Sequence, residues 1–540
     1  MAKEITIEIK KPEIIILLVF LAVILFLELQ LTFNSPIVFG DEGWHTRLAQ
    51  FISQKIEYPA WIPYEGTKLV EYSFPRPPVW NLLEGSFLFI FGFHESIVKF
   101  LTPFIAVLVG LVVFLLGKKI YGKEVSFIAA LITITVPSFV TYSVLFYDVT
   151  LLVFYLTMFM LTFFLAIKGE GKRYWVLSGI FGALSFLTKT PGFAVFPMIA
   201  LGFLYQVYKK EKITDLFKNY LLMGLLLILI ISTFFIRSYI YYGTPMCQLS
   251  LLNNSGCTKT FDYKNTKDMP TQLEQTGTAM NIFQIGFINY LNFAYGIIWF
   301  VPLMLLCGLV TIFYKKEKMD ILIILAILSF IPIFYFSYSS ESRAEDTART
   351  MLGLVGIISL ACGLYLGGIY DFIKIYYKQL ALVVFIFVFI LSFLNFYDKL
   401  NTMKSVKQFS PAFLQACDFV KKNVSEDAVI MTIWGGQSEY NCQRNIAGFN
   451  FPDSGDIVLS ENLILVLSRL KAHGITHIFI QLFSISQTPV GEKYPISFIQ
   501  FLESNPDTFV KIYENGPDLQ QCIQAGGCDG NILYEINYKK

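Results

Sequence analysis

Long apolar runs separated by short polar segments make up most of the chain. The first run, from Ile14 to about Phe33, is long enough for a helix that crosses a bilayer, and no small-residue cleavage site follows it. We therefore expect it to remain as a membrane span rather than to be removed as a signal peptide. Further runs of similar length continue to a last one near residues 380–397.

Basic residues in the short loops indicate which span ends face the cytoplasm, because Lys and Arg accumulate on that side. If all the basic loops lie inside, an even number of spans must separate neighbouring loops, and the run lengths agree. The segment 174–208 is then a hairpin of two short spans that turns at Lys189. The pattern predicts about 11 transmembrane helices and a cytoplasmic N-terminus. The basic loops lie at 118–123, 168–173, 209–212, 315–318 and 374–378.

Two further helices are expected in the long outer loop, residues 34–94, that follows the first span. From Trp44 to Ile56, large apolar residues recur on one helical face, which is typical of a helix lying at the membrane interface. The stretch from Trp80 to Phe93 is apolar but too short to span, so it should lie at the interface too. The run from Ile97 to Leu116 then crosses back.

The pattern changes after the last span. Ser410 can cap a helix that starts at Pro411 and continues to about Val420. Shorter apolar stretches and one amphipathic stretch then alternate, as in a small α/β domain. We therefore divide the chain into a transmembrane module, residues 1–398, and an extracytoplasmic domain, residues 399–540. Strands are expected at 428–433, 476–481, 510–513 and 532–536, and a helix at 461–472.

The amino-acid composition supports a membrane protein and restricts the classes of partner that it could bind. The chain is 55% hydrophobic and only 15% charged, with a mean hydropathy of +0.58, and a soluble protein of this length needs more charge to cover its surface. We expect a polytopic α-helical membrane protein that crosses the cell membrane many times. The net charge of +2 gives no indication of a nucleic-acid partner.

The eight cysteines fall into groups by their surroundings. Two pairs close in sequence, Cys247 with Cys257 and Cys522 with Cys528, lie in polar segments and suggest local disulfides in an oxidising compartment. Whether Cys417 and Cys442 pair stays open. Cys307 and Cys362 lie in apolar runs and act as small hydrophobic residues. The cysteines form no CxxC motif, and no His lies at zinc-finger spacing from a cysteine pair, so we reject a structural zinc site.

Ionisable residues gather on the predicted outer side, several of them in otherwise apolar stretches. An ionisable group at the membrane edge is costly to leave unpaired and suggests a functional site. Lys and Arg near span ends can reach the head groups, but the short carboxylate of Asp148 cannot. The adjacent pair Asp41 and Glu42 can also simply cap a helix. The candidates are Asp41, Glu42, His45, Arg76, Asp148, Lys189, Arg237, Arg343 and Arg349.

Three carboxylates and several cations beside apolar walls suit one kind of chemistry. Arg and Lys can hold a phosphate, and a carboxylate can take the proton from an attacking hydroxyl. Apolar walls suit a ligand with a lipid tail. Together these features predict sugar transfer from a lipid-linked phosphate to an acceptor hydroxyl on the outer face.

Five motifs across residues 13–370 resemble one superfamily, the integral-membrane GT-C glycosyltransferases. In particular, they resemble the branch of protein O-mannosyltransferases and aminoarabinose transferases, which has an Asp-Glu pair after the first span. The order and the predicted side of the motifs agree with that branch, although Ser238 stands where it has Asn. The motifs are Asp41-Glu42, Arg76-Pro77-Pro78-Val79-Trp80, Phe146 to Leu152, Gly182 to Lys189, and Ile236-Arg237 followed by Gly243-Thr244-Pro245.

The resemblance implies a GT-C fold and roles for these residues. Asp41 takes the place of the general base, Lys189 and Arg237 would hold the phosphate of a polyprenyl- or dolichyl-phosphate sugar, and a single displacement would invert the anomeric carbon. The acceptor could be protein, lipid or glycan. No cofactor is required. Because the phosphate leaves as a stable anion, a second carboxylic acid that protonates the leaving group is not essential either. Glu42, His45 and Asp148 would orient the acceptor or the base, and Arg76, Arg343 and Arg349 would contact substrate.

Two alternatives stay open. An oligosaccharyltransferase-like GT-C enzyme would transfer a whole glycan to Asn and would need a divalent metal. Trp434-Gly435-Gly436 occupies the place of that family's Trp-Trp-Asp motif but lacks the acid. A lipid or solute transporter is the second alternative, and the internal repeat that often accompanies it is not seen in the sequence.

Overall fold

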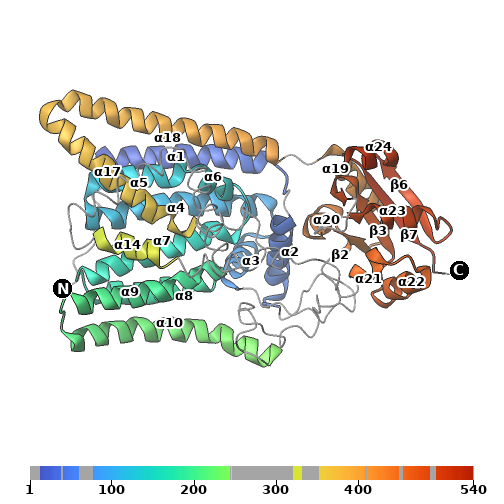
Figure 1. The fold of residues 1–540 in the computed structure, drawn as a ribbon, viewed down its shortest axis with the longest axis horizontal. Helices are drawn as coiled ribbons and strands as arrows, with labels where there is room; N and C mark the ends of the chain where they lie inside the picture. Colours follow the sequence, from blue (N-terminus) through green and yellow to red (C-terminus); the bar gives the residue numbers. More distant parts are fainter. Residues whose placement is uncertain are drawn as a thin grey trace, which may run out of the picture.

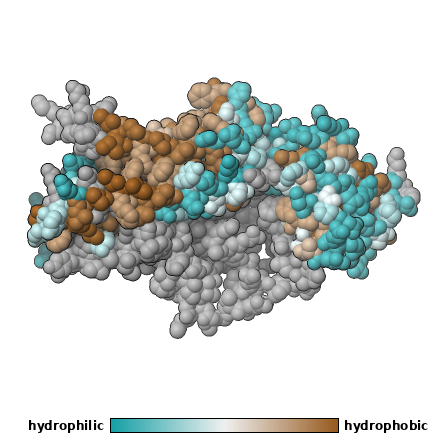
Figure 2. Space-filling model, turned by 90° about the horizontal axis from the view of Figure 1, so that it is seen from above, coloured by the Kyte–Doolittle hydropathy of each residue, from teal (hydrophilic) through white to brown (hydrophobic). Residues whose placement is uncertain are grey.

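The computed structural model describes residues 12–37, 40–59, 77–243, 245, 320–330, 352–407, 410–433, 435–448, 454–486 and 494–538. A helical part lies at one end of the molecule and a smaller α/β part at the other, with α2 (Gly40–Lys55) facing the gap between them (Figure 1). On the face shown in Figure 2, the described surface is largely apolar over the helical part and largely hydrophilic over the α/β part. Phe26 and Leu229, each 66% exposed, belong to the apolar surface, as expected where lipid replaces water.

The helical part confirms a multi-pass membrane architecture. In the described ranges six helices are long and apolar enough to span, or up to seven if the bent pair counts as one span. That pair is α5 (Lys123–Thr135) and α6 (Pro137–Ser143), with 62° between them. The total of about 11 spans stays a prediction, since residues 246–319 and 331–351 lie outside the described residues. The six helices include α1 (Pro12–Asn34), α4 (Glu95–Tyr121), α7 (Asp148–Ile167), α9 (Val195–Tyr208), α10 (Ile213–Tyr242) and α17 (Val355–Tyr376).

The segment 174–208 forms the predicted helical hairpin. Helix α8 (Lys172–Phe186) ends before Lys189, and a short 3-10 turn, η1 (Thr190–Ala194), leads into α9. The turn closes tightly on α8, because a Cβ added at Gly192 would lie 2.3 Å from the carbonyl oxygen of Ser185. Only glycine fits there, and this close approach fixes the place of Lys189.

The two outer-loop helices are present as predicted. Helix α2 begins at Gly40, and α3 (Val79–Phe91) begins directly after Pro78. They pack closely because Gly85 has no side chain, and a Cβ there would lie 2.7 Å from Cγ2 of Ile52. The last helix of the helical part, α18 (Lys378–Val406), covers the run predicted at 380–397 and extends beyond it at both ends. A shorter helix, α14 (Asp320–Leu328), lies between the two undescribed segments 246–319 and 331–351.

Glu84 is buried on the face of α3 that it shares with Trp80 and Leu88. Neither of its carboxyl oxygens has a hydrogen-bond partner within the described ranges. Burial raises the pKa of this carboxyl from 4.5 to about 8, because the charged form loses its hydration. Glu84 is therefore mostly neutral at pH 7.

This pKa shift predicts a pH-dependent stability. The pKa of Glu84 is higher in the folded state than in the unfolded state, so the contribution of its protonated carboxyl to the free energy of unfolding is complete below pH 4.5. As the pH rises toward 8, the free energy of unfolding falls by as much as about 1.4 kcal/mol per pH unit. Glu84→Gln should therefore have a higher Tm than the wild type at pH 8 and nearly the same Tm at pH 5. Thermal unfolding in detergent measures both. An equal difference in Tm at the two pH values would contradict this prediction. So would a similar effect of the control Glu124→Gln, whose side chain is 41% exposed.

The α/β part is built on a five-stranded sheet of order β2-β1-β3-β7-β6. The first three strands in this order are parallel, and β7 pairs antiparallel with both of its neighbours. Four of the strands match the predicted ones. The fifth, β2, was not predicted, because Asn445 to Gly448 has only one large apolar residue. The strands are β1 (Val429–Thr432), β2 (Asn445–Gly448), β3 (His477–Gln481), β6 (Phe509–Asn515) and β7 (Asn531–Ile536).

Helices cover both faces of this sheet, since alternate strand residues point to opposite sides. One face packs against α19 (Pro411–Asn423), where the Ser410 side chain accepts from the backbone N–H of Phe413 as predicted. The other face packs against α22 (Leu463–Ala472). The remaining elements are α20 (Gly435–Cys442), α21 (Ser454–Leu459), η5 (Leu482–Ser484), β4 (Ile485–Ser486), β5 (Tyr494–Pro495), α23 (Ile496–Glu503) and α24 (Leu519–Ala525).

Two disulfides stabilise the α/β part. The expected local bond joins Cys522 and Cys528 beside α24. Cys417 and Cys442, which the sequence left open, are also bonded and fasten α20 to α19. Cys362 is a buried free thiol in α17, as expected of a small hydrophobic residue. Cys247, Cys257 and Cys307 lie outside the described residues.

Candidate functional site

Asp41 and Glu42 lie in the first turn of α2, where their negative charge suits the positive end of the helix dipole. Asp41 is half-buried, whereas Glu42 is fully buried. Oε1 of Glu42 accepts from the backbone N–H of Phe146, at 2.9 Å, and lies 3.2 Å from Nζ of Lys407. The two neighbouring carboxylates thus have different environments, and only that of Asp41 is partly open.

Asp148 and Lys189, predicted from separate motifs, meet in space. Nζ of Lys189 lies 2.5 Å from Oδ1 of Asp148, the first residue of α7. The lysine side chain is 28% exposed and the aspartate 15%, so the pair is accessible from one side. A short charge-assisted contact of this kind fixes the direction of the ammonium group.

Backbone and side-chain contacts bring four motif segments together. Glu42 on α2 binds Phe146, two residues before Asp148. The backbone N–H of Val79, at the start of α3, donates to the carbonyl oxygen of Leu187, at 3.0 Å, two residues before Lys189. The first acidic motif, the Pro-Pro-aromatic motif, the second acidic motif and the hairpin turn therefore form one neighbourhood.

His45 is buried one turn after Asp41, and α3 holds its ring. Its Nδ1 lies 2.7 Å from Oδ1 of Asn81, and its ring meets that of Trp80 edge-on at 6.3 Å. An amide oxygen accepts, so this contact calls for the proton on Nδ1. The imidazole is thus oriented by a residue that the sequence did not indicate.

Arg237, near the end of α10, lies against the segment that follows α2. Its guanidinium donates to the carbonyl oxygen of Pro59 and packs over the rings of Tyr58, at 4.9 Å, and Tyr241, at 5.3 Å. Stacking on aromatic rings is typical of a guanidinium that keeps a fixed plane. Three other predicted substrate contacts, Arg76, Arg343 and Arg349, lie outside the described residues.

Sequence reasoning missed Lys407. It follows α18 directly, is 1% exposed, and donates to the carbonyl oxygen of Val144, at 2.8 Å, as well as contacting Glu42. A lysine just past a membrane helix usually reaches toward the head groups, and nothing local in the sequence distinguishes this one. Its role is visible only through its distant partners.

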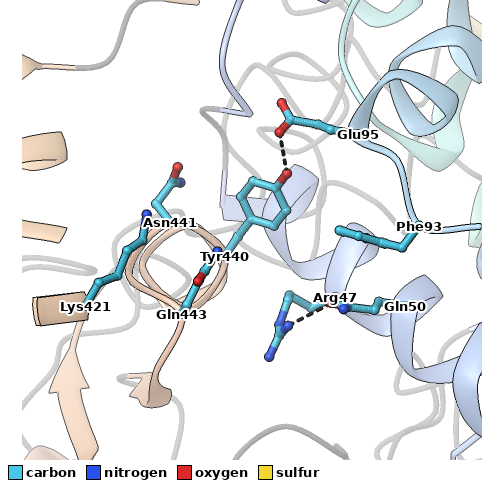
Figure 3. A pocket seen from close by; sticks show the side chains of 8 residues that line it. All are labelled: Arg47, Gln50, Phe93, Glu95, Lys421, Tyr440, Asn441 and Gln443. Atoms are coloured by element: carbon cyan, nitrogen blue, oxygen red, sulfur yellow. Dashed lines mark hydrogen bonds between the residues drawn. The ribbon is translucent and has the colours of Figure 1, made fainter. Parts of the chain in front are cut away.

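A cavity of about 470 Å³ lies on another side of α2, at the contact with the α/β part. Arg47 and Gln50 point into it from α2, and Tyr440 enters from α20 and donates to Glu95, at 2.8 Å (Figure 3). At about 100° per residue, Gln50 lies roughly opposite Asp41 around the helix. The cavity therefore belongs to the contact between the two parts rather than to the neighbourhood of Asp41.

Within the described ranges, no three His, Cys, Asp or Glu side chains come together as potential metal ligands.

Among curated proteins, no sequence matches the chain. The sequence pattern of the family of dolichyl-phosphate-mannose-protein mannosyltransferases matches residues 75–236, which include Asp148 and Lys189.

Solved structures share the whole architecture at low sequence identity. ArnT from Cupriavidus metallidurans, bound to undecaprenyl phosphate, matches with a TM-score of 0.60 and 10% identity, over 97% of this chain and 98% of ArnT. The oligosaccharyltransferase AglB from Archaeoglobus fulgidus, in complex with an inhibitory peptide and a dolichol-phosphate, matches with a TM-score of 0.60 and 12% identity, over 97% and 74%. The apo form of the A. fulgidus enzyme matches with a TM-score of 0.62 and 12% identity, over 94% and 81%.

These likenesses confirm the expected fold, a helical membrane part followed by an α/β part. The sequence match covers the second acidic motif and the hairpin, where the ion pair between Asp148 and Lys189 forms. The chain thus has the fold of the ArnT and AglB structures, and its residues 75–236 resemble the dolichyl-phosphate-mannose-protein mannosyltransferases, so it is similar to multi-pass membrane glycosyltransferases of the GT-C superfamily.

Proposed function

We propose that this protein transfers a sugar from a polyprenyl- or dolichyl-phosphate donor to an acceptor hydroxyl on the outer face of the membrane, with inversion. The observation that carries the proposal is the ion pair between Asp148 and Lys189 beside the segment held by Glu42. This ion pair brings together a carboxylate and an ammonium group from two different sequence motifs, next to apolar helices. The ArnT structure is bound to undecaprenyl phosphate and the AglB structure to a dolichol-phosphate, which supports such a donor.

In this proposal Asp41 is the general base. Asp41 is only half-buried, so an acceptor can approach its carboxylate, whereas the carboxylate of Glu42 is fully buried. The acceptor oxygen gives its proton to the Asp41 carboxylate and bonds to the anomeric carbon. The bond from that carbon to the phosphate oxygen breaks, and both its electrons leave with the lipid phosphate.

Lys189 and Arg237 hold the phosphate of the donor before and after this step. Lys189 supplies a compact charge, and Arg237 can bind two oxygens at once. His45, oriented by Asn81, is assigned to the acceptor side, and Arg76, Arg343 and Arg349 remain proposed substrate contacts. The N-terminus is proposed to lie in the cytoplasm and the domain at residues 399–540 outside, with α18 continuing to Val406.

A direct assay tests this function. Purified protein is mixed with labelled dolichyl-phosphate mannose and membranes as the source of acceptor. We expect release of dolichyl phosphate and transfer of label to a hydroxyl, identified by mass spectrometry. Inversion is read from the linkage. If polyprenyl-phosphate donors with mannose, glucose and aminoarabinose all give no release, the proposal is wrong.

A second candidate is transfer of a whole lipid-linked glycan to asparagine, since the fold matches AglB as well as ArnT. The two candidates differ in their need for metal. We expect activity on a hydroxyl to survive EDTA, because phosphate is a stable leaving group. Loss of activity in EDTA, its return with added Mn²⁺, and label on asparagine would together favour the oligosaccharyltransferase-like enzyme.

A further inference from the structure

Lys407 makes contacts that are unusual for a residue at the end of a membrane helix. Its side chain is 1% exposed, and the carboxylate of Glu42 is 0% exposed. Nζ of Lys407 lies 3.2 Å from Oε1 of Glu42 and 2.8 Å from the carbonyl oxygen of Val144. A buried charge pair is held in one geometry only if its remaining hydrogen bonds are made as well, and here they include two backbone groups.

The same Glu42 oxygen also accepts from the N–H of Phe146, at 2.9 Å. Lys407 and Glu42 therefore hold both ends of the turn 144–146 against the first turn of α2. Asp41 immediately precedes Glu42, and Asp148 follows Phe146 by two residues. This buried contact is therefore one of those that set the separation between Asp41 and the pair of Asp148 with Lys189.

Lys407 also lies where the chain leaves the membrane part for the α/β part. The α/β part docks on α2 and on the start of α4 through two further side-chain contacts. Nε of Arg47 lies 3.4 Å from Oε1 of Glu439, and Tyr440 donates to Glu95. The position of α2 is therefore set from two sides, by Lys407 at its first turn and by α20 along its length.

We propose that Lys407 is a positioning residue for sugar transfer. Through Glu42 and Val144 it fixes the acidic turn of α2 relative to the turn that leads to Asp148, and it does not itself touch substrate. This inference rests on the proposed function, in which Asp41 takes the proton and Lys189 holds the phosphate.

The first test compares Lys407→Met with Lys404→Met, an exposed lysine one turn earlier on α18. With dolichyl-phosphate mannose as donor, we expect Lys407→Met to lower kcat about 10²-fold and to leave KM for the donor unchanged, since small displacements of reacting groups cost rates of this order. Lys404→Met should keep wild-type values. An unchanged kcat, or a rise in donor KM alone, would overturn the proposal.

A double variant separates positioning from stability. Lys407→Met leaves Glu42 buried without its cation, whereas Glu42→Gln with Lys407→Met removes both charges and should regain the lost Tm. We expect kcat of the double variant to stay low, because the hold on Val144 is gone. If kcat recovers along with Tm, the role of Lys407 is only structural.

Hydrogen–deuterium exchange tests the same inference without turnover. In Lys407→Met, exchange should rise in residues 40–46 and 144–150, and strands β3 and β7 should stay protected. If exchange in Lys407→Met rises only around residue 407, Lys407 does not position the two turns, whatever the activity of the variant. If the wild type turns over none of the donors, the proposed function fails, and the exchange result still decides whether Lys407 holds the two turns.

Discussion

Replacing Asp41 with asparagine is expected to lower kcat by about 10²- to 10⁴-fold, the usual contribution of a general base. The affinity for dolichyl phosphate should not change, because that ligand binds through the cations and the apolar walls. Asparagine keeps the size of the side chain, so α2 should still form. Single-turnover release of dolichyl phosphate from the labelled donor and a binding titration measure the two quantities.

Glu57→Gln is the matched control, since Glu57 is an exposed acid just beyond the other end of α2. It should behave as the wild type. Asp148→Asn provides a second comparison, since it removes the partner of Lys189 and should also lower turnover. If Asp41→Asn and Asp148→Asn both kept near-normal turnover, the assignment of the site would be wrong.

Lys189→Gln should weaken binding of dolichyl phosphate about 30-fold, because a charge-assisted contact worth roughly 2 kcal/mol is lost. The variant also leaves Asp148 without its cation in a half-buried place, and the carboxylate then repels the phosphate. Both effects have the same sign. Titration of the purified protein with dolichyl phosphate in detergent measures the Kd.

The control for this prediction is Lys218→Gln, an exposed lysine near the start of α10. It should leave the Kd unchanged. If Lys189→Gln bound dolichyl phosphate as tightly as the wild type, Lys189 would serve only to neutralise Asp148. The phosphate site would then have to be built from Arg237 and cations outside the described residues.

The ion pair between Asp148 and Lys189 and the one between Glu42 and Lys407 differ in exposure, and the difference separates their roles. The side chains of the first pair are 28% and 15% exposed, so in the proposed function an incoming phosphate can contact Lys189. The side chains of the second pair are 1% and 0% exposed, and they bind backbone groups instead of a ligand. In the proposed function, Asp41 is therefore the general base and its neighbour Glu42 is a positioning residue.

The sequence by itself determined the apolar helices, the hairpin at Lys189, the outer helices α2 and α3, and most of the sheet. These features depend on hydropathy period, on charge in short loops, and on local residues such as Gly192 and Pro78, all of which act over a few neighbouring positions. Residues of the candidate site were predicted for the same reason, since ionisable side chains are rare in apolar stretches. The sequence missed β2 and α20, which are short and weakly patterned.

Only the tertiary structure decided which distant partners the residues of the candidate site contact and how deeply each is buried. Glu42 and Lys407 are 365 positions apart, and no local pattern specifies that they meet in a dry interior. The same holds for His45 with Asn81 and for the disulfide between Cys417 and Cys442. Burial, and with it the strength of a charge pair, is a property of packing between distant segments. That packing left Asp41 partly open and sealed its neighbour Glu42.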